Sequence, residues 1–198
     1  LRIEDIDTPR SVPGADLQIL NQLRACGLFW DEEPSYQSLR QEHYQAALLR
    51  LNQLGMLYAC TCSRQTIANT LAAAGIHTPR NQEMVYPRTC RPSQIAPYSD
   101  EFLNETKKAL RIALPENCDI QFEDLSLGTQ TQNLNQDVGD FVLRRNDGLF
   151  TYQLAVVVDD AEQGITHVVR GQDLLNNTAR QIYLQNQLSY PTPSYRHL

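Results

Sequence analysis

The longest nearly uncharged run of the chain covers residues 149–173, and it constrains the fold more than any other segment. An apolar run of this length has to be buried, whereas the charged residues around it, Asp159, Asp160, Arg170 and Asp173, need water or polar partners. In α/β folds, ligands bind at such rims, outside the carboxyl ends of parallel strands. The same pattern also fits a core strand followed by a solvated turn, so this segment alone leaves both interpretations open.

Within this run the pattern changes at Gly164. The β-branched residues after it predict a short, fully buried strand over 165–169. Asn177 or Thr178 is then expected to cap a helix. Residues 152–160 are ambiguous, because a run of valines favours a strand while the length and the glycine stop allow a helix.

Composition limits the class of protein. The chain has 198 residues, of which 41% are hydrophobic, as is typical of a globular protein with one good-sized core. The formal net charge of -6 excludes a uniformly basic nucleic-acid surface, although a local basic patch is compatible with it. No apolar run approaches the length of a membrane span. We therefore expect a soluble, cytoplasmic monomer without a membrane partner.

Residues 1–7 start as an alternating, strand-like segment and end in a group of acids, Glu4, Asp5 and Asp7. Carboxylates gathered at a strand end are unfavourable unless they bind a cation, an ammonium group or a hydroxyl. The alternative is an ordinary surface turn in which Asp7 acts as a cap.

Cysteine spacing indicates a metal site. The chain has 5 cysteines, an odd number that fits a secreted disulfide framework poorly, and Cys60, Cys62 and Cys90 lie in one region. Three thiolates need a fourth donor to complete a tetrahedral zinc site. His77 is the usual chemical choice and Tyr86 the unusual one. The alternative is a set of reduced cysteines in a small core, as we also expect for the remaining two, Cys26 and Cys118.

The remaining patterns predict the order of elements. Apolar residues at helical spacing predict a helix over 39–54 that Gly55 ends, and Ser63 is expected to cap the helix after the cysteine pair. The polar residues 129–135 predict an exposed loop, and residues 195–198 predict a strand at a sheet edge.

These elements divide the chain into three parts. Residues 1–58 and 140–198 have α/β character, and residues 59–139 form an irregular, metal-bearing insert between them.

Four segments together carry a resemblance to a known family: LRIEDIDTPR, the Cys-Thr-Cys with its downstream Tyr-x-x-x-Cys, RRNDGLFTYQLAVVVDD, and ITHVVRGQDLLNNTARQIYL. The chain resembles the glutamyl-tRNA synthetase group of class I aminoacyl-tRNA synthetases over nearly all its length, most weakly in 93–136. The resemblance implies an α/β fold, a Rossmann-like class I catalytic domain with a zinc-bearing α/β insertion. Residues 1–58 and 140–198 would be the two parts of that domain.

Within this group the chain is most similar to the truncated paralogues that attach glutamate to the queuosine base of tRNA(Asp). Tyr86 stands four residues before Cys90, and Arg91-Pro92 follows without the later histidine that bacterial glutamyl enzymes often have. The segments RGQDLL and GLFWDEEPSYQS point the same way. The resemblance implies a structural Zn2+ held by Cys60, Cys62, Tyr86 and Cys90.

The resemblance also implies that Glu4, Tyr152 and Arg170 bind L-glutamate. A carboxylate can hold the α-ammonium group, a phenol can orient a polar group, and arginine suits a carboxylate. A buried guanidinium without an opposing anion is unfavourable, so Arg170 is expected to reject neutral analogues. We expect Asp5, Asp7 and Asp173 to play supporting or nucleotide-side roles.

The function implied is the activation of glutamate by ATP, with Mg2+, and its transfer to tRNA(Asp) carrying queuosine. The HIGH-like and KMSKS-like elements of the family are expected upstream of Leu1 and beyond Leu198, so we assign no ATP ligand. Two alternatives stay open: a fragment of an ordinary glutamyl-tRNA synthetase, and a non-catalytic RNA-binding module derived from a synthetase.

Overall fold

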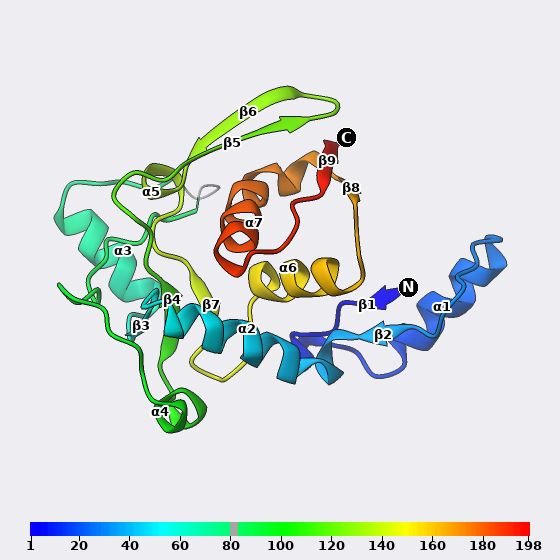
Figure 1. The fold of residues 1–198 in the computed structure, drawn as a ribbon, viewed down its shortest axis with the longest axis horizontal. Helices are drawn as coiled ribbons and strands as arrows, with labels where there is room; N and C mark the ends of the chain where they lie inside the picture. The colour runs from blue at the N-terminus through cyan, green and yellow to red at the C-terminus, as the bar shows by residue number, and fades with distance from the viewer. Residues whose placement is uncertain (80–82) are drawn as a thin grey trace.

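The computed structural model describes residues 1–79 and 83–198, whose strands form three sheets (Figure 1). The smallest pairs β1 (Arg2–Ile3) with β2 (Ser35–Tyr36) in parallel. The second is antiparallel, in the order β3 (Leu57–Cys60), β4 (Ala109–Ile112), β7 (Val142–Arg144). The third has the order β6 (Gly128–Asn133), β5 (Asp119–Asp124), β9 (Ser194–His197), β8 (His167–Arg170), and β9 runs parallel to both its neighbours.

Helices connect and cover these sheets. The α-helices are α1 (Ala15–Ala25), α2 (Gln41–Gln53), α3 (Arg64–Ala73), α4 (Asp100–Glu105), α5 (Leu134–Asp137), α6 (Tyr152–Glu162) and α7 (Leu175–Leu188). Short 3-10 turns are η1 (Thr8–Arg10), η2 (Gln37–Leu39) and η3 (Gln172–Leu174). The predicted α/β class is confirmed. No helix in the described ranges combines the length and the apolar content that a membrane span requires.

The main core lies where α2, α6 and α7 pack together and against the β3-β4-β7 sheet. The predicted face of α2 is confirmed, since Tyr44, Leu48 and Leu51 are completely buried. The helix ends where predicted, because Gly55 adopts a φ of 68° that favours glycine. Ser63 caps α3 as predicted, accepting a hydrogen bond from the Thr66 amide at 3.0 Å.

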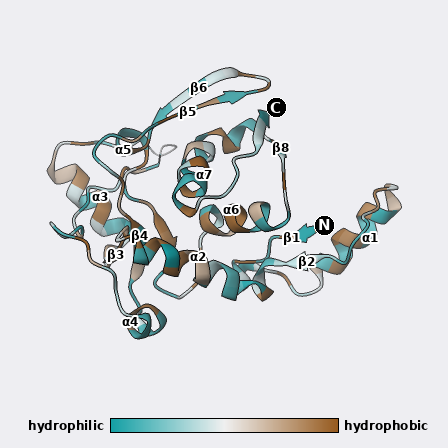
Figure 2. Cartoon of the chain, viewed as in Figure 1, coloured by the Kyte–Doolittle hydropathy of each residue, from teal (hydrophilic) through white to brown (hydrophobic). Residues whose placement is uncertain are grey.

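Residues 152–160, which the pattern left ambiguous, belong to helix α6. Its residues Leu154–Val158 are all buried, and the helix forms an apolar band in the middle of the molecule (Figure 2). Because these consecutive residues are all buried, their valines alone could not distinguish a helix from a strand. The prediction that Asn177 or Thr178 caps the next helix is wrong. Both residues lie inside α7, which begins at Leu175 directly after the turn η3.

Three predictions about the four-stranded sheet are wrong. The segment 165–169 is not a fully buried strand, because β8 is an edge strand and Val169 is 60% exposed. The strand near the chain end is not at an edge, because β9 lies between β5 and β8. The polar segment 129–135 is not a loop, since most of it forms β6, which pairs with β5 in the hairpin labelled in Figure 1. Backbone pairing with β5 compensates for its lack of apolar residues.

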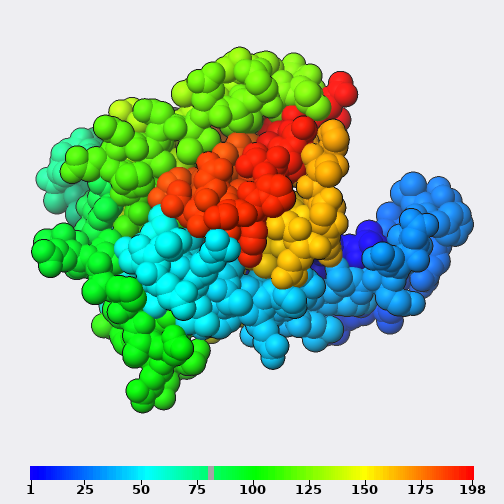
Figure 3. Space-filling model, in the orientation of Figure 1, coloured from blue at the N-terminus to red at the C-terminus, as the bar shows by residue number. Residues whose placement is uncertain are grey.

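The first 40 residues contain few buried side chains, only those of Leu20 and Gln37. Only Arg2–Ile3 of the predicted segment 1–7 is a strand. Helix α1 projects from the body of the molecule (Figure 3), and Leu17 on it is 61% exposed. Cys26 at its end is exposed, so the prediction of a buried thiol is wrong there, whereas Cys118 is buried as expected.

Candidate functional site

A cavity of ≈ 770 Å³ lies between the first strand, helix α6 and strand β8. Glu4, Tyr152 and Arg170 all line it, so the structure brings together residues that are far apart in the sequence. Glu4 follows β1, Tyr152 begins α6, and Arg170 ends β8. A cavity of this size is typical of small-molecule sites.

Arg170 provides the positive side of this cavity. Its Nη1 donates to the Tyr152 hydroxyl at 3.4 Å, its Nη2 to the Thr178 hydroxyl at 2.8 Å, and its Nε to Nε2 of His197 at 3.1 Å. Its guanidinium carbon also lies 5.5 Å from the centre of the Tyr195 ring. Within the described residues Arg170 forms no ion pair with an acid, so its charge is available to an anionic ligand.

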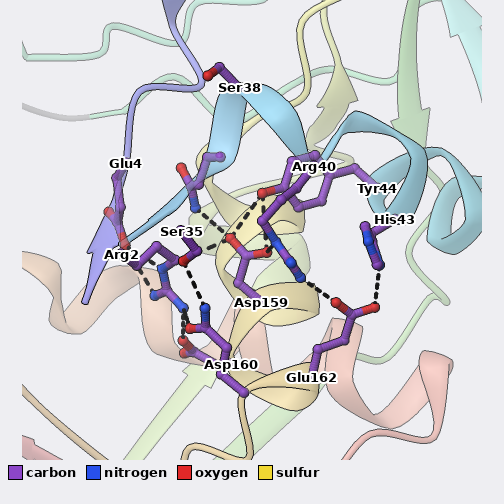
Figure 4. A network of polar contacts seen from close by, with 12 residues as sticks. Arg2, Glu4, Ser35, Ser38, Arg40, His43, Tyr44, Asp159, Asp160 and Glu162 are labelled. Atoms are coloured by element: carbon purple, nitrogen blue, oxygen red, sulfur yellow. Dashed lines mark hydrogen bonds and ion pairs between the residues drawn. The ribbon is translucent and has the colours of Figure 1, made fainter. Parts of the chain in front are cut away.

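Acidic groups provide the other side. Arg2 holds the Glu4 carboxylate at 3.1 Å and the Asp160 carboxylate at 2.8 Å, as Figure 4 shows. The Glu4 side chain is 43% exposed and therefore open to a ligand. Burial raises the pKa of Asp160, although the neighbouring Arg2 opposes the shift. The cavity thus offers carboxylates to a cationic group and a guanidinium to an anionic one.

The other acids that the sequence singled out do not line the cavity. Asp5 accepts hydrogen bonds from the Ser38 amide at 2.9 Å and its hydroxyl at 2.6 Å. Asp7 pairs with Arg145 at 3.3 Å, which joins the first segment to the turn after β7. These contacts hold the chain around the site together.

Asp159 is not at the rim, where the sequence placed it, but completely buried behind the cavity. Its carboxylate accepts a hydrogen bond from Gln37 at 2.8 Å. It also accepts from Arg40 at 2.7 Å and from the Tyr44 hydroxyl at 2.9 Å, both of which Figure 4 shows. Gln37 lies in η2, Arg40 lies between η2 and α2, and Tyr44 lies in α2, so Asp159 ties α6 to η2 and to the first turn of α2.

Sequence reasoning missed Arg2, His197 and Thr178. Arg2 lies within a segment that was singled out for its acids. Its contact with Asp160 of α6 joins residues far apart in the sequence, so no pattern in the residues around Arg2 indicates it. Thr178 and His197 are buried polar residues of α7 and β9, and they meet Arg170 only through the packing of that helix on the sheet.

The predicted thiols also come together. Ligand atoms of Cys60, Cys62 and Cys90 lie within 4.8 Å of one another and could hold a metal ion. The Tyr86 hydroxyl is 3.3 Å from the Cys60 sulfur and 3.7 Å from the Cys62 sulfur. A tetrahedral ion with bonds of about 2.3 Å requires donors roughly 3.8 Å apart, so this set fits such an ion with little movement. His77, the alternative fourth donor, is an exposed residue outside this group.

The surroundings of the thiols favour a thiolate at one position. Burial alone would raise the pKa of Cys90, but hydrogen bonds from the Thr61 backbone and the Tyr86 hydroxyl outweigh it and lower this pKa to about 6. Burial raises the pKa of Cys62 to about 11. Arg111 lies 3.7 Å above the centre of the Tyr86 ring and places a positive charge beside the cluster.

Comparison with known proteins identifies the family. The family described as "tRNA synthetases class I (E and Q), catalytic domain" matches residues 1–198. The chain belongs to this family. The predicted fold, a class I synthetase catalytic domain, is therefore confirmed, and so is the resemblance to the glutamyl group.

Relatives of this class I synthetase chain include two proteins named glutamyl-Q tRNA(Asp) synthetase. The one from Burkholderia cenocepacia (strain HI2424) is 50% identical over 200 residues, covering 100% of the chain and 63% of the relative. The one from Leptothrix cholodnii is 49% identical over 200 residues, covering 100% of the chain and 65% of the relative. The chain thus spans less than two thirds of the length of these relatives.

A solved synthetase structure has the same fold. The crystal structure of a glutamate tRNA ligase from Elizabethkingia meningosepticum in complex with its amino acid superimposes with a TM-score of 0.81 at 29% identity. The match covers 100% of the chain and 42% of that ligase.

Proposed function

We propose that the protein containing this chain activates L-glutamate with ATP and transfers the glutamyl group to the queuosine base of tRNA(Asp). The observation that carries the proposal is 50% identity over the whole chain to a protein named glutamyl-Q tRNA(Asp) synthetase. The charge distribution of the cavity supports glutamate as the substrate, because this amino acid has one ammonium group and two carboxylates.

In this proposal Arg170 pairs with the side-chain carboxylate of glutamate, and Tyr152 orients it through its hydroxyl. Glu4 binds the α-ammonium group. An amino acid with a neutral side chain would leave the guanidinium without an anion, and a partly buried charge without a partner is unfavourable. Arg170 therefore carries the selectivity of the site.

The chemistry takes place in two steps. An oxygen of the glutamate α-carboxylate attacks the α-phosphorus of ATP, which forms glutamyl-adenylate and releases pyrophosphate. A hydroxyl of the cyclopentenediol of queuosine then attacks the activated carbonyl, which forms an ester and releases AMP. Mg2+ accompanies ATP and offsets its phosphate charge. The residues of this chain contribute by binding and orienting glutamate, and no protein nucleophile is needed.

Cys60, Cys62, Tyr86 and Cys90 are proposed to bind a structural Zn2+. Four protein donors leave no open position, so the ion would hold the region around α3 together rather than react. We further propose that residues 59–139 form the insertion into the catalytic domain, and that the protein acts as a monomer in the cytoplasm, where tRNA is available.

A second candidate is an ordinary glutamyl-tRNA synthetase, because the structural neighbour is a glutamate tRNA ligase. ATP–pyrophosphate exchange by the full-length protein separates the two functions. We expect glutamate-dependent exchange without any tRNA, followed by transfer of labelled glutamate to tRNA(Asp) that contains queuosine and not to tRNA(Asp) that lacks it. Exchange that requires tRNA(Glu) would establish the second candidate, and the absence of adenylate formation under all conditions would establish a non-catalytic module.

A further inference from the structure

Behind Arg170, on the side away from the cavity, lies a chain of buried polar residues from three other elements. His197 of β9 is 1% exposed, Thr178 of α7 is 0% exposed and Asp124 of β5 is 3% exposed. Nε2 of His197 lies 3.1 Å from Nε of Arg170 and 3.2 Å from the Thr178 hydroxyl. Nδ1 of His197 lies 2.6 Å from Oδ2 of Asp124. An unbroken set of hydrogen bonds therefore leads from Asp124 to the guanidinium.

The direction of these hydrogen bonds follows from the chemistry of arginine. The guanidinium has only donors, so Nε2 of His197 has to accept from Nε of Arg170. The imidazole is then neutral and carries its proton on Nδ1, which donates to Asp124. A proton on Nε2 would point at the N–H of Arg170 and remove the acceptor, and if Nδ1 kept its proton as well, two positive charges would lie next to each other.

Asp124 is itself held in place. Its Oδ1 accepts from the backbone amides of Ser126 at 3.0 Å and Leu127 at 2.9 Å, and its Oδ2 accepts from the His197 amide at 3.1 Å. Burial would raise the pKa of Asp124, but the hydrogen bonds from His197 and from these amides lower it to about 2. The carboxylate therefore remains an acceptor and selects one tautomer of the imidazole.

We propose that His197 is a positioning residue for substrate recognition: its neutral imidazole, held in one tautomer by Asp124, fixes the guanidinium of Arg170 toward the cavity. Thr178 completes the arrangement by accepting from Nη2 at 2.8 Å. With Nε and Nη2 occupied from behind, Nη1 remains beside Tyr152 for the ligand. The role in recognition rests on the proposed binding of glutamate by Arg170.

An arginine side chain has many rotamers, and ordering it when the ligand binds would weaken the binding. Contacts that order it beforehand remove this cost. The Arg170 side chain is held on three of its nitrogens, by His197, Thr178 and Tyr152, before any ligand is bound. We therefore expect the loss of the His197 contact to act on glutamate and not on ATP.

Two substitutions of similar size separate the two contacts of His197. In His197→Gln the amide oxygen can reach the position of Nε2 and accept from Arg170. In His197→Asn the shorter amide reaches only the position of Nδ1, beside Asp124. With the full-length protein, we expect His197→Asn to raise KM for glutamate in pyrophosphate exchange roughly tenfold with an unchanged KM for ATP. His197→Gln should recover most of this loss.

Equal effects of the two variants, or a parallel rise in KM for ATP, would overturn the proposal, since a purely structural role predicts them. A second measurement does not depend on activity. In NMR spectra of 15N-labelled protein without substrate, the Nε–H proton of Arg170 should be protected from exchange with solvent in wild type and in His197→Gln. It should lose this protection in His197→Asn. If this pattern appears in a protein that lacks glutamate-dependent exchange, the proposed function fails while the positioning contact stands. An unprotected signal in wild type would refute the contact itself.

Discussion

Replacing Asp159 with asparagine tests the network that joins α6 to α2. The Asp159 carboxylate is 0% exposed and accepts from three donors, Gln37, Arg40 and Tyr44. Asparagine has nearly the same shape, but one of its oxygens is replaced by an NH2 group that would face these donors. At least one buried donor then loses its acceptor, and Arg40 loses the anion that lies 2.7 Å from it.

The magnitude follows from burial. Removing one partner of a buried ion pair costs about 3–5 kcal/mol. The Arg40 side chain is 20% exposed and keeps its second pair with Glu162, so we expect the lower end, about 3 kcal/mol. For a domain of this size, 1 kcal/mol corresponds to about 2–4 °C, so Tm should fall by roughly 6–12 °C.

Glu162→Gln is the matched control. Glu162 lies on the same helix and also pairs with Arg40, but its side chain is 38% exposed, and exposed pairs contribute about 0–1 kcal/mol. Urea unfolding followed by circular dichroism at 222 nm would give the free energies of unfolding of wild type and both variants. If Asp159→Asn were no more destabilising than Glu162→Gln, the assignment of Asp159 as the lock between α6 and α2 would be refuted.

Four further predictions concern single residues. Arg170→Ala should reduce kcat/KM for glutamate about thirtyfold, equivalent to about 2 kcal/mol, whereas Arg196→Ala on the exposed side of β9 should have little effect. Cys62→Ser should abolish the binding of about one zinc per chain and lower Tm, as metal analysis and calorimetry would show; metal-free wild type with an unchanged Tm would contradict the site. Arg144 is 5% exposed, and its Nε and Nη2 have no partner among the described residues. Arg144→Met should therefore raise the free energy of unfolding by about 1 kcal/mol in urea titrations, and a loss of stability would contradict this reading. Because the pKa of Asp124 is lowered from 3.8 to about 2 by its hydrogen bonds against the effect of burial, its contribution to stability is complete above pH 4 and is lost as pH falls through 2. Unfolding free energies measured across this range should decrease with falling pH, with a smaller slope for Asp124→Asn.

Local signals predicted the elements whose cause is local. The helix over 39–54 has an apolar face at helical spacing, and Ser63 and Gly55 are residues whose preferred positions at helix ends are well understood. The cysteine cluster was predictable in part, since three of the 5 cysteines lie in one region of the chain, although the same pattern also fitted reduced cysteines in a small core. The fourth donor was not decided by spacing, and the resemblance to the family named Tyr86.

The wrong predictions concern elements whose state depends on their neighbours. β6 is polar along its whole length and becomes a strand only because β5 provides a partner for its backbone. β9 follows a proline-containing segment near the end of the chain, yet it lies inside the sheet because β8 and β5 pair with its two edges. Residues 154–158 of α6 are buried in succession because α2 and α7 both pack against this helix, so their run of valines did not by itself distinguish a helix from a strand. No window of sequence contains these partners.

The sequence by itself determined the residue types at the site, the grouping of the thiols and the membership of a family, because these depend on short segments read one at a time. The tertiary structure decided which residues share a cavity. It brought Arg2 next to Asp160, and it placed His197 and Asp124 behind Arg170. The physical reason is that hydrogen bonds and ion pairs act over a few ångströms in space, and only the packing of helices and sheets brings distant parts of a chain within that range.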